Sequence, residues 1–464
     1  MFDTICGTVP ADGATSPRTR RLDILRRVLD GSIYNGLPYE FHEERNSAGE
    51  YVPLRLRKPS VRYGLCRIVV EDSVALLFSN AHFPTVETND TDISRVLADI
   101  VCETRMNEVM IEAAIRGSVG SVAILLRILR GRTYLSVLDS LYLSPQWNPQ
   151  APDTLQHVKE LYQVSGEALI AQGYDGVEPD STYWFQREWD IVNETWYIPL
   201  LVNEPQVAPK IDTVRSLRHG LGFVPLVWIR NLPGGDGIDG ACTFRAAIES
   251  NIEIDYQLSQ AGRGLKYSSD PTLLIKEPAV GDSEIVKGAG NALVVSEKGD
   301  AKLLEIGGTA SEAVISYVRT LRELALEAVH GNRSSADRLT AAQSGRALEL
   351  MNQGLIWLAD NLRISYGDGG VLAVMKMIVA ASHIYKLQVM GTIVAPLNRA
   401  VRLTLRWPRW YPLSADDRLK EAQAISILAN AGQISQQTAV KSLAAAMGVV
   451  DVNAELTAIH EDSK

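Results

Sequence analysis

Hydrophobic residues recur at helical spacing in some segments of the chain and alternate with polar residues in others. The helical spacing predicts helices over residues 18–29, 60–77, 92–115, 243–268 and 311–329, one opening at 344–349, and two in the tail that begin near Ser414 and Ser435. Alternation and short apolar runs predict strands over 121–128, 222–229, 272–275, 292–295, 302–306 and 401–407, and a hairpin over 181–200. Residues 1–16 are predicted to be a loose arm. The pattern therefore predicts an α+β fold that is mostly helical.

Two long amphipathic helices enclose a short insert that is predicted to be rich in β-structure. The first carries an apolar stripe of Phe244, Ala247, Ile248, Ile252, Leu258, Ala261 and Leu265, with Glu249, Glu253, Asp255 and Arg263 on its other faces. The second carries Val314, Val318, Leu321, Leu324, Ala325 and Ala328 on one side, and Arg319, Arg322, Glu323 and Glu327 on the other. The strands between them are too short to make a core alone, so we expect them to pair with neighbouring subunits.

Length and charge narrow the class of protein. The 464 residues suggest about three structural units, and 46% hydrophobic with 22% charged residues is typical of a folded chain. A net charge of −9 excludes a generally basic surface that would hold nucleic acid through its phosphates. The longest apolar stretches fall well short of the roughly 20 residues that cross a bilayer, and the first residues lack a signal-peptide pattern. We therefore expect no membrane association, and synthesis in the cytoplasm.

The sequence lacks the common motifs for catalysis and cofactor binding. No Gly-Lys-Ser, Gly-Lys-Thr or Gly-x-Ser-x-Gly occurs, and the glycine-rich segment 234–240 lacks the spacing of a phosphate-binding loop, so it is predicted to be a hinge or turn. The seven histidines are scattered without metal-ligand spacing. The wide spacing of Cys6, Cys66, Cys102 and Cys242 predicts buried, reduced thiols. The sequence thus predicts no enzyme, no metal and no cofactor.

Two groups of residues have both a structural and a functional interpretation. One is a run of arginines that either contacts phosphate or, as we favour, forms a solvated or intersubunit helix face: Arg18, Arg20, Arg21, Arg26 and Arg27. The other is the aromatic hairpin, whose tryptophans either stack on bases or sugars or, as we favour, pack within a sheet. An enzyme acting on nucleic acid or carbohydrate through 183–197, with Asp190 and Glu194, is therefore the alternative from a different class.

A series of short segments follows in a fixed order along the chain. These are Val224-Pro225-Leu226-Val227 with Asn231, the helical segment 254–259, the β-rich insert, helix 311–329, Ser344-Gly345-x-Ala347-Leu348, and in the tail 431–435 with Glu455. In this order they resemble the portal proteins of tailed bacteriophages, and the resemblance covers roughly residues 20–460. Its specificity comes from the collinear order, because each motif alone recurs by chance.

The resemblance implies a portal-type architecture, assembled as a dodecameric ring at a unique capsid vertex of the virion, through which double-stranded DNA is packaged and ejected. It implies a wing formed by 1–240 and 345–411, stem helices at 241–268 and 311–330, a clip at 269–310, a tunnel loop at 331–344 and a crown at 412–464. The implied partners are further copies of the chain, DNA held without sequence preference, the terminase large subunit, major capsid and scaffolding proteins, and head-completion or tail proteins. Another virion structural protein, a capsid or tail-tube subunit, is the nearer alternative.

The resemblance also implies which residues face the channel. In the tunnel loop these are Asn332, Arg333, Ser334, Ser335, Asp337 and Arg338, and in the stem they are Arg263, Lys266, Glu323 and Glu327. An acidic chain lets DNA slide because few cations bind its phosphates, while a few rings of Arg or Lys make transient contacts. Intersubunit salt bridges are an equally weighted alternative for these cations, and a solvated helix face is the alternative for the two glutamates.

Overall fold

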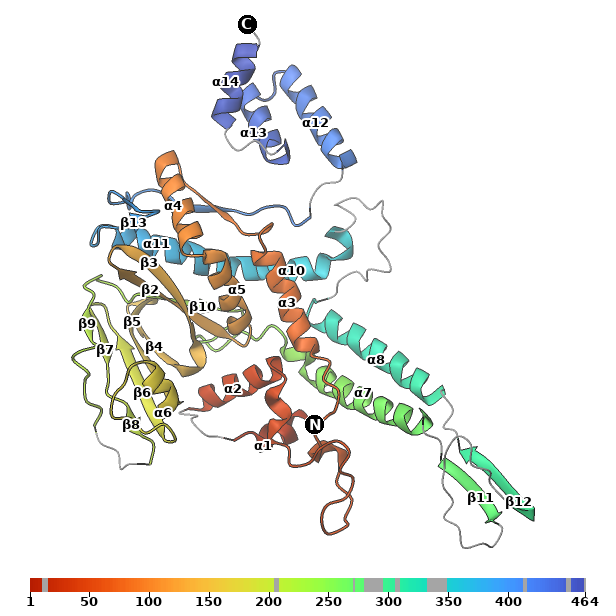
Figure 1. Ribbon diagram of the computed structural model, residues 1–464. Coiled ribbons are helices and arrows are strands. Elements are labelled where there is room, and N and C mark those ends of the chain that lie inside the picture. The colour runs from red at the N-terminus through yellow and green to blue at the C-terminus, as the bar shows by residue number, and fades with distance from the viewer. Residues whose placement is uncertain are drawn as a thin grey trace.

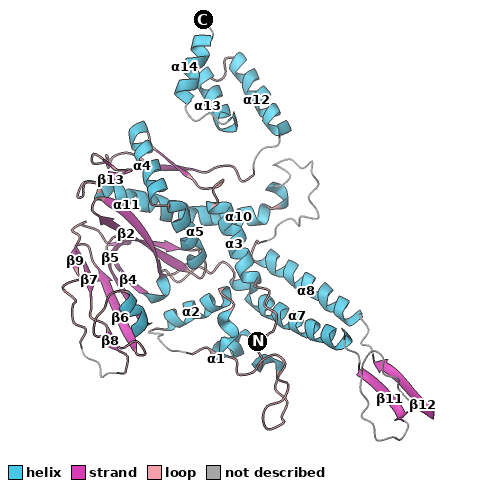
Figure 2. Ribbon diagram, in the orientation of Figure 1, coloured by secondary structure: helices cyan, strands magenta, loops and turns pink. Residues whose placement is uncertain are grey.

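The computed structural model describes residues 1–10, 16–203, 208–269, 272–278, 295–304, 309–331, 349–411, 415–447 and 452–462. Helices and several antiparallel sheets form an α+β body, which confirms the predicted fold class (Figure 2). Two parts extend from this body (Figure 1). One is a pair of long helices, α7 (Ile248–Ser269) and α8 (Thr309–Ala328), and the other is a C-terminal group, α12 (Ala415–Asn430), α13 (Gln436–Met447) and α14 (Val452–Asp462).

A three-stranded antiparallel sheet lies at the centre of the body. Its middle strand is β2 (Ser121–Leu129), paired with β10 (Leu226–Arg230) on one side and β3 (Arg132–Asp139) on the other. Ile124 in β2 belongs to the main hydrophobic core, whereas its neighbour Leu125 faces a second core that contains Trp189. Because both faces of β2 are covered, its sequence is a continuous apolar run rather than an alternating one.

A second antiparallel sheet flanks the first. Its strands lie in the order β4 (Leu143–Asn148), β5 (Ala151–Ser165), β6 (Thr182–Trp189), β7 (Asn193–Trp196) and β9 (Leu217–Arg218), with β8 (Leu200–Leu201) beside β6 and the short helix α6 (Gly166–Ala171) after β5. Side chains of β6 alternate between buried and partly exposed positions, with Phe185 and Trp189 inward. The hairpin predicted over 181–200 is confirmed, because β6 and β7 pair directly.

The first third of the chain forms several helices, the last of which packs against β2 and β3 of the central sheet. They are α1 (Phe2–Thr8), α2 (Pro17–Leu29), α3 (Leu65–Phe78), α4 (Thr91–Glu103) and α5 (Met106–Gly117), with 3-10 turns at Ser32–Gly36, Leu54–Leu56, Ser140–Tyr142 and Arg245–Ala247. The loose arm predicted for 1–16 is wrong over α1, because Phe2 and Ile5 are buried in the core. The single helix predicted over 92–115 is two helices, since Arg105 between them has a φ of 49°. The helix predicted from residue 60 begins only after Gly64, whose φ is 68°.

One continuous helix crosses the body, formed by α10 (Gln353–Leu362), the π-helical segment Arg363–Leu372 and α11 (Ala373–Ala381). Its 29 residues are long and apolar enough to cross a membrane by length and composition alone, but half of the apolar window is buried within the fold. A Cβ on Gly367 would come within 2.5 Å of the Trp407 ring, and one on Gly370 within 2.9 Å of Met110. This close packing is that of a core helix.

Short strands and capped helices complete the chain. β1 (Thr85–Glu87) pairs with β15 (Thr404–Arg406), and β13 (Gln388–Val389) pairs with β14 (Thr392–Ile393). In the tail, the left-handed Gly432 follows α12, and the Ser435 hydroxyl accepts a hydrogen bond from the Thr438 N–H at 3.1 Å at the start of α13. The two helices predicted in the tail are therefore confirmed, together with the cap of the second.

Candidate functional site

The helices α7 and α8 form a stalk that leaves the body and carries a two-stranded β tip (Figure 1). The tip consists of β11 (Thr272–Pro278) and β12 (Val295–Leu304), which pair in antiparallel register. The two predicted long helices are confirmed, as are the strands predicted at 272–275 and, for residues 302–304, at 302–306. Residues 292–294 and 305–306 lie outside the described part of the chain.

The exposure of apolar side chains increases along the stalk. At its base, Ile252 of α7 is 1% exposed and Ala325 of α8 is 2% exposed. Farther out on α8, Ile315 is 50% exposed and Tyr317 is 47% exposed, while Leu324, beside Ala325 at the base, is 57% exposed on the opposite face of the helix. The predicted stripes are therefore only partly buried, because Leu324 and, on α7, Leu265 face solvent in the single chain. An isolated pair of helices has one shared interface, so its outer apolar side chains are available to a partner.

The base of the stalk is anchored by a buried carboxylate. Asp255 is 1% exposed, and its carboxylate accepts hydrogen bonds from the Tyr34 hydroxyl at 2.7 Å and from the Tyr63 N–H at 2.6 Å. The next residue, Tyr256, donates its hydroxyl to the Arg57 carbonyl at 2.8 Å. Burial raises the pKa of Asp255, and the two hydrogen bonds offset this only in part. The sequence placed Asp255 on a polar face of the helix; it is instead the point where residues 34–63 hold α7.

The stem candidates lie at separate places on the stalk. Arg263 forms an ion pair with Glu44, which belongs to a loop of the body, so this cation is held within the chain. Lys266, Glu323 and Glu327 are exposed, as expected of a solvated helix face. All six tunnel-loop candidates, residues 332–335, 337 and 338, lie outside the described part of the chain.

The N-terminal arginines are mostly used within the chain. The ion pairs are Arg18 with Asp239 at 2.7 Å, Arg21 with Asp236 at 2.6 Å, Arg27 with Asp23 at 2.8 Å, and Arg26 with Asp139. Neither a phosphate-binding face nor a purely solvated one therefore describes this group, because four of its five members neutralise nearby carboxylates. Asp239 is 2% exposed and also accepts a hydrogen bond from the Ser121 hydroxyl, so the pair with Arg18 fastens α2 to the glycine-rich segment 234–240.

The carboxylates of the aromatic hairpin have structural roles. Asp190 accepts backbone hydrogen bonds from Val192 and Asn193 at 2.6 and 2.7 Å. Burial acts to raise the pKa of Asp190, but these hydrogen bonds outweigh it and lower the pKa below its usual value. Glu194 is buried and paired with Arg127 at 2.7 Å. Both groups are thus committed to holding the sheet together.

The four cysteines are free thiols, and they differ in exposure. Cys66 is buried, Cys6 and Cys242 are half-buried, and Cys102 is exposed. The prediction of burial is wrong for Cys102, because it lies two residues beyond the inward-facing Ile100 on α4, about 200° around the helix. Within the described residues, no group of three or more His, Cys, Asp and Glu side chains is placed to hold a metal ion.

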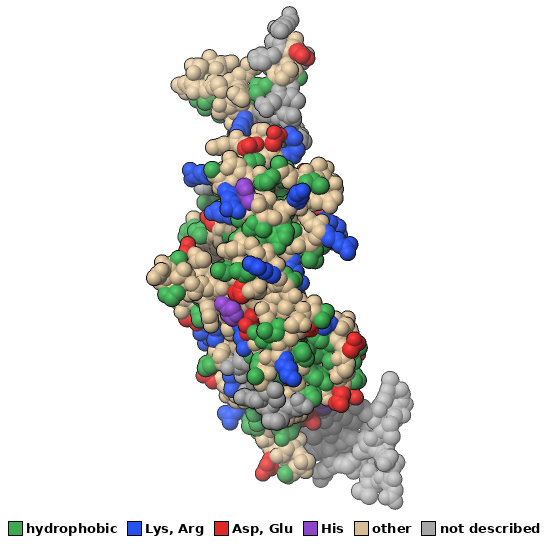
Figure 3. Space-filling view, turned by 90° about the vertical axis from the view of Figure 1, so that its left-hand side faces the viewer, with side chains coloured by type: hydrophobic (Ala, Val, Ile, Leu, Met, Phe, Trp, Pro, Cys, Tyr) green, Lys and Arg blue, Asp and Glu red, His purple; other side chains and the backbone are tan. Residues whose placement is uncertain are grey.

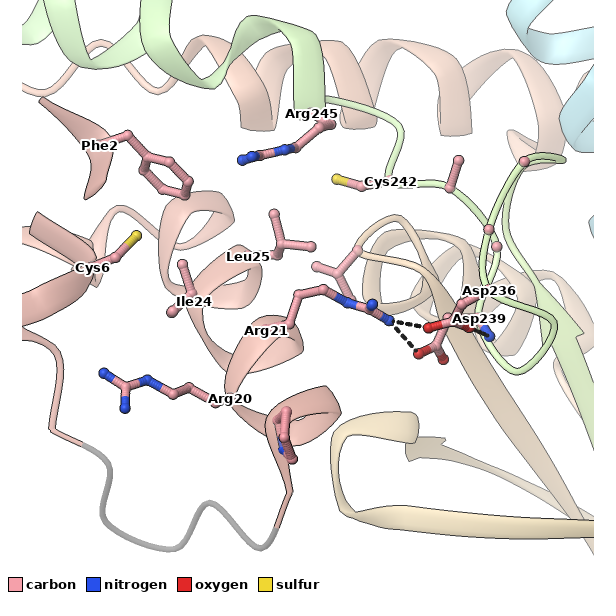
Figure 4. A pocket seen from close by; sticks show the side chains of 16 residues that line it. Phe2, Cys6, Arg20, Arg21, Ile24, Leu25, Asp236, Asp239, Cys242 and Arg245 are labelled. Atoms are coloured by element: carbon pink, nitrogen blue, oxygen red, sulfur yellow. Dashed lines mark hydrogen bonds and ion pairs between the residues drawn. The ribbon is translucent and has the colours of Figure 1, made fainter.

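A cavity of 700 Å³ lies between α1, α2 and the segment 234–240 (Figure 4). Apolar side chains, among them Phe2, Ile24 and Leu25, line it together with Arg20 and Arg245. Burial raises the pKa of Cys6 in its wall, so this thiol stays protonated near neutral pH. Sequence reasoning missed this cavity, because its walls come from residues more than 200 positions apart.

The face of the molecule that carries β6, β7 and β9 shows no large area of one charge (Figure 3). Acidic, basic and hydrophobic side chains are interspersed over it.

No protein-family model matches the chain, and neither does any curated protein. Among solved structures, one described as "Neck of native GTA particle computed with C12 symmetry" is similar over 94% of this chain and 96% of that chain, with 11% sequence identity and a TM-score of 0.44.

Proposed function

We propose that the chain is the portal subunit of a tailed-bacteriophage-like virion: a non-enzymatic protein that forms a ring at one capsid vertex and conducts double-stranded DNA. The observation that carries this proposal is the stalk. Its helices leave the body, hold a β tip and expose Ile315 and Leu324, which are 50% and 57% exposed. Such side chains are suited to burial between neighbouring copies of the chain. The collinear segments that resemble portal proteins support the same assignment.

In this proposal each part of the chain has a role in the ring. Residues 1–240 and 345–411 are the wing, α7 and α8 the stem, 269–310 the clip that meets terminase and head-completion proteins, 331–344 the tunnel loop and 412–464 the crown. The net charge of −9 suits a conduit, since a chain with few unpaired cations does not grip the phosphates that slide past it. The intramolecular ion pairs of Arg18, Arg21, Arg26 and Arg263 further reduce the number of cations free for DNA.

The particle mass and rotational symmetry of the purified protein test the proposal. We expect native mass spectrometry and electron-microscope class averages to give a closed, dodecameric ring of 50.9-kDa chains with an open centre wide enough for a duplex. Assembly is repeated with scaffolding and capsid protein from the same source, so that a chain that needs them is still tested. Hexamers, open polymers or a stable monomer under both conditions contradict the proposal, as does any hydrolytic turnover on nucleic acid.

The tunnel loop supplies a prediction within this proposal. Replacing Arg333 and Arg338 by Ala removes two cations per copy from the predicted channel, so packaging or retention of DNA falls while rings still form. Packaged DNA is measured by nuclease protection in assembled particles. Arg130→Ala, at an exposed turn between β2 and β3, is the matched control. Wild-type packaging in the double variant refutes a DNA contact at this loop.

A further inference from the structure

The cavity beside α2 combines an apolar lining with two arginines, Arg20 and Arg245. In Figure 4, Arg20 and Arg245 lie on opposite sides of Ile24 and Leu25, and the Arg245 guanidinium sits 5.1 Å from the centre of the Phe2 ring. Among the described residues, neither arginine forms an ion pair, whereas Arg21 on the same helix is neutralised by carboxylates of the 234–240 segment. The cavity therefore suits a ligand that offers a carboxylate next to a large apolar side chain.

The charges around the cavity support this description. Cys6 in its wall is close enough to both Arg20 and Arg245 for each to act on its thiol. Asp3 and Glu249 also act on Cys6, but neither of them lines the cavity. Among the charged side chains that line the cavity, Arg21 is paired with Asp236 and Asp239, so Arg20 and Arg245 are the cations that can select an acidic segment.

The same chain carries a projecting hairpin with the complementary chemistry. Residues 44–52 fold back on themselves: the Val52 N–H donates to the Glu44 carbonyl at 2.8 Å, and the Asn46 N–H donates to the Glu50 carbonyl at 2.9 Å. The Asn46 side chain closes the turn, accepting from the Glu50 N–H and donating to the Glu50 carboxylate, both at 2.9 Å. Figure 1 shows this loop extending from the body near the N-terminus.

The hairpin presents an aromatic ring beside a carboxylate. Tyr51 is 68% exposed, although its hydroxyl is held by the Arg57 guanidinium at 3.0 Å, and Glu50 before it is exposed as well. Because the turn is already ordered in the single chain, docking it costs little conformational entropy. We propose that the hairpin of one copy docks into the cavity of a second copy, with Tyr51 against the apolar lining and Glu50 at Arg20 and Arg245.

This contact joins two different surfaces of identical chains, so it propagates around a ring or along an open polymer. The inference rests on the proposed function, because it names the residues of one contact within the ring. It is noncovalent, and its strength comes from burial of the Tyr51 ring and from charge-assisted hydrogen bonds to Glu50.

Disulfide cross-linking tests the contact without reference to ring symmetry. Ala48→Cys, which keeps Tyr51 and Glu50 and is made in a Cys102→Ser background that removes the exposed thiol, is oxidised with copper phenanthroline in air. In the proposed contact, the thiol introduced at position 48 of the exposed turn enters the side of the cavity that carries Cys6 and Cys242 of the second copy. We expect a ladder of cross-linked chains on a non-reducing gel, lost when Cys6 and Cys242 are also replaced by Ser. Tyr134→Cys, at a 42% exposed site on β3, is the control that forms no such ladder.

Reversing the charges on the two sides of the proposed contact provides a second test of it. Glu50→Arg, or Arg20→Glu with Arg245→Glu, lowers the multimeric fraction about tenfold at fixed concentration, and the three changes together restore it. Arg130→Glu is the control, and circular dichroism verifies that each variant is folded. A ladder and a charge rescue without closed rings support the contact and refute the portal. Closed rings with no ladder and no response to charge reversal refute the contact and leave the portal proposal standing. Monomers with no ladder refute both.

Discussion

The base and the outer half of the stalk are made from the same two helices, yet they relate to the rest of the chain in opposite ways. At the base, Ile252 and Ala325 are 1% and 2% exposed, and residues 34–63 wrap around α7. In the outer half, Ile315 and Tyr317 are 50% and 47% exposed. The helical period of hydrophobic residues is similar in both halves. A periodic stripe therefore identifies the apolar face of a helix but not what covers it.

The largest difference between the two halves should appear on removing a tyrosine from each. Tyr256→Ala deletes a buried ring and its hydrogen bond to the Arg57 carbonyl, so we expect the free energy of unfolding to fall by about 3–5 kcal/mol. Tyr317→Ala, at a 47% exposed position of α8, changes it by less than about 0.5 kcal/mol. Urea unfolding followed by circular dichroism measures both. Equal losses contradict the distinction between base and outer half.

Removing a hydrogen bond from the buried Asp255 at the base should give a second, smaller loss in the free energy of unfolding. Tyr34→Phe removes the hydroxyl that donates to Asp255 at 2.7 Å, which leaves a buried anion with one hydrogen bond fewer. We expect a loss of about 1–3 kcal/mol in the free energy of unfolding at neutral pH. Tyr317→Phe is the matched control, because the Tyr317 ring is 47% exposed.

The pH dependence of this loss identifies the carboxylate as its cause. The pKa of Asp255 is raised above its ordinary value of 3.8, so the stability it contributes is full below that value and declines as pH rises through the folded pKa. The Tyr34 hydroxyl lowers this pKa, and its removal raises the pKa further. The loss in the free energy of unfolding caused by Tyr34→Phe should therefore be larger at about pH 7.5 than at about pH 4. A deficit that is independent of pH means that lost packing, not Asp255, is responsible.

The outer half should respond in assembly rather than in folding. Ile315→Ser combined with Tyr317→Ser leaves the free energy of unfolding of the monomer within about 1 kcal/mol, because both side chains are exposed in the single chain. In the proposed ring the same side chains are buried between copies, so the multimeric fraction falls roughly tenfold. Mass photometry at fixed concentration measures the fraction. Unchanged assembly removes the stalk from the subunit interface.

Local signals predicted the elements that local physics determines. The helix over 18–29 begins after Ser16, whose hydroxyl accepts from the Thr19 N–H, and the tail helix after Ser435 is capped in the same way. The stalk helices are long and strongly periodic, so they too were predictable. The strands β3, β4 and β5 were not predicted: β3 has no fully buried residue, and β5 is half-polar on a partly exposed sheet. Their pairing depends on partner strands, which a local sequence pattern cannot identify.

The sequence predicted where the candidate site lies in the chain but not which contacts form it. The sequence identified the two stem helices, but it assigned Asp255 to a solvated face because a carboxylate in an amphipathic helix is usually exposed. Only Tyr34 and Tyr63, about 190 or more positions away, explain its burial. The cavity near Arg20 was likewise outside the reach of periodicity, since it forms where α1, α2 and the 234–240 segment meet. Long-range contacts thus account for most of what was missed.

The smallest predicted effect extends the comparison to the C-terminal helices, which, like the outer stalk, are largely exposed. With little core to stabilise it, α13 depends on its cap, where the Ser435 hydroxyl accepts from the Thr438 N–H at 3.1 Å. Ser435→Ala should therefore cost α13 about 1 kcal/mol of local stability, seen as faster amide hydrogen exchange across its first two turns. Ser442→Ala, inside the same helix, should leave exchange unchanged or slow it, because alanine favours the helix interior. If both variants exchange like wild type, α13 is stabilised by packing against α12 and α14, and the C-terminal group resembles the base of the stalk rather than its outer half.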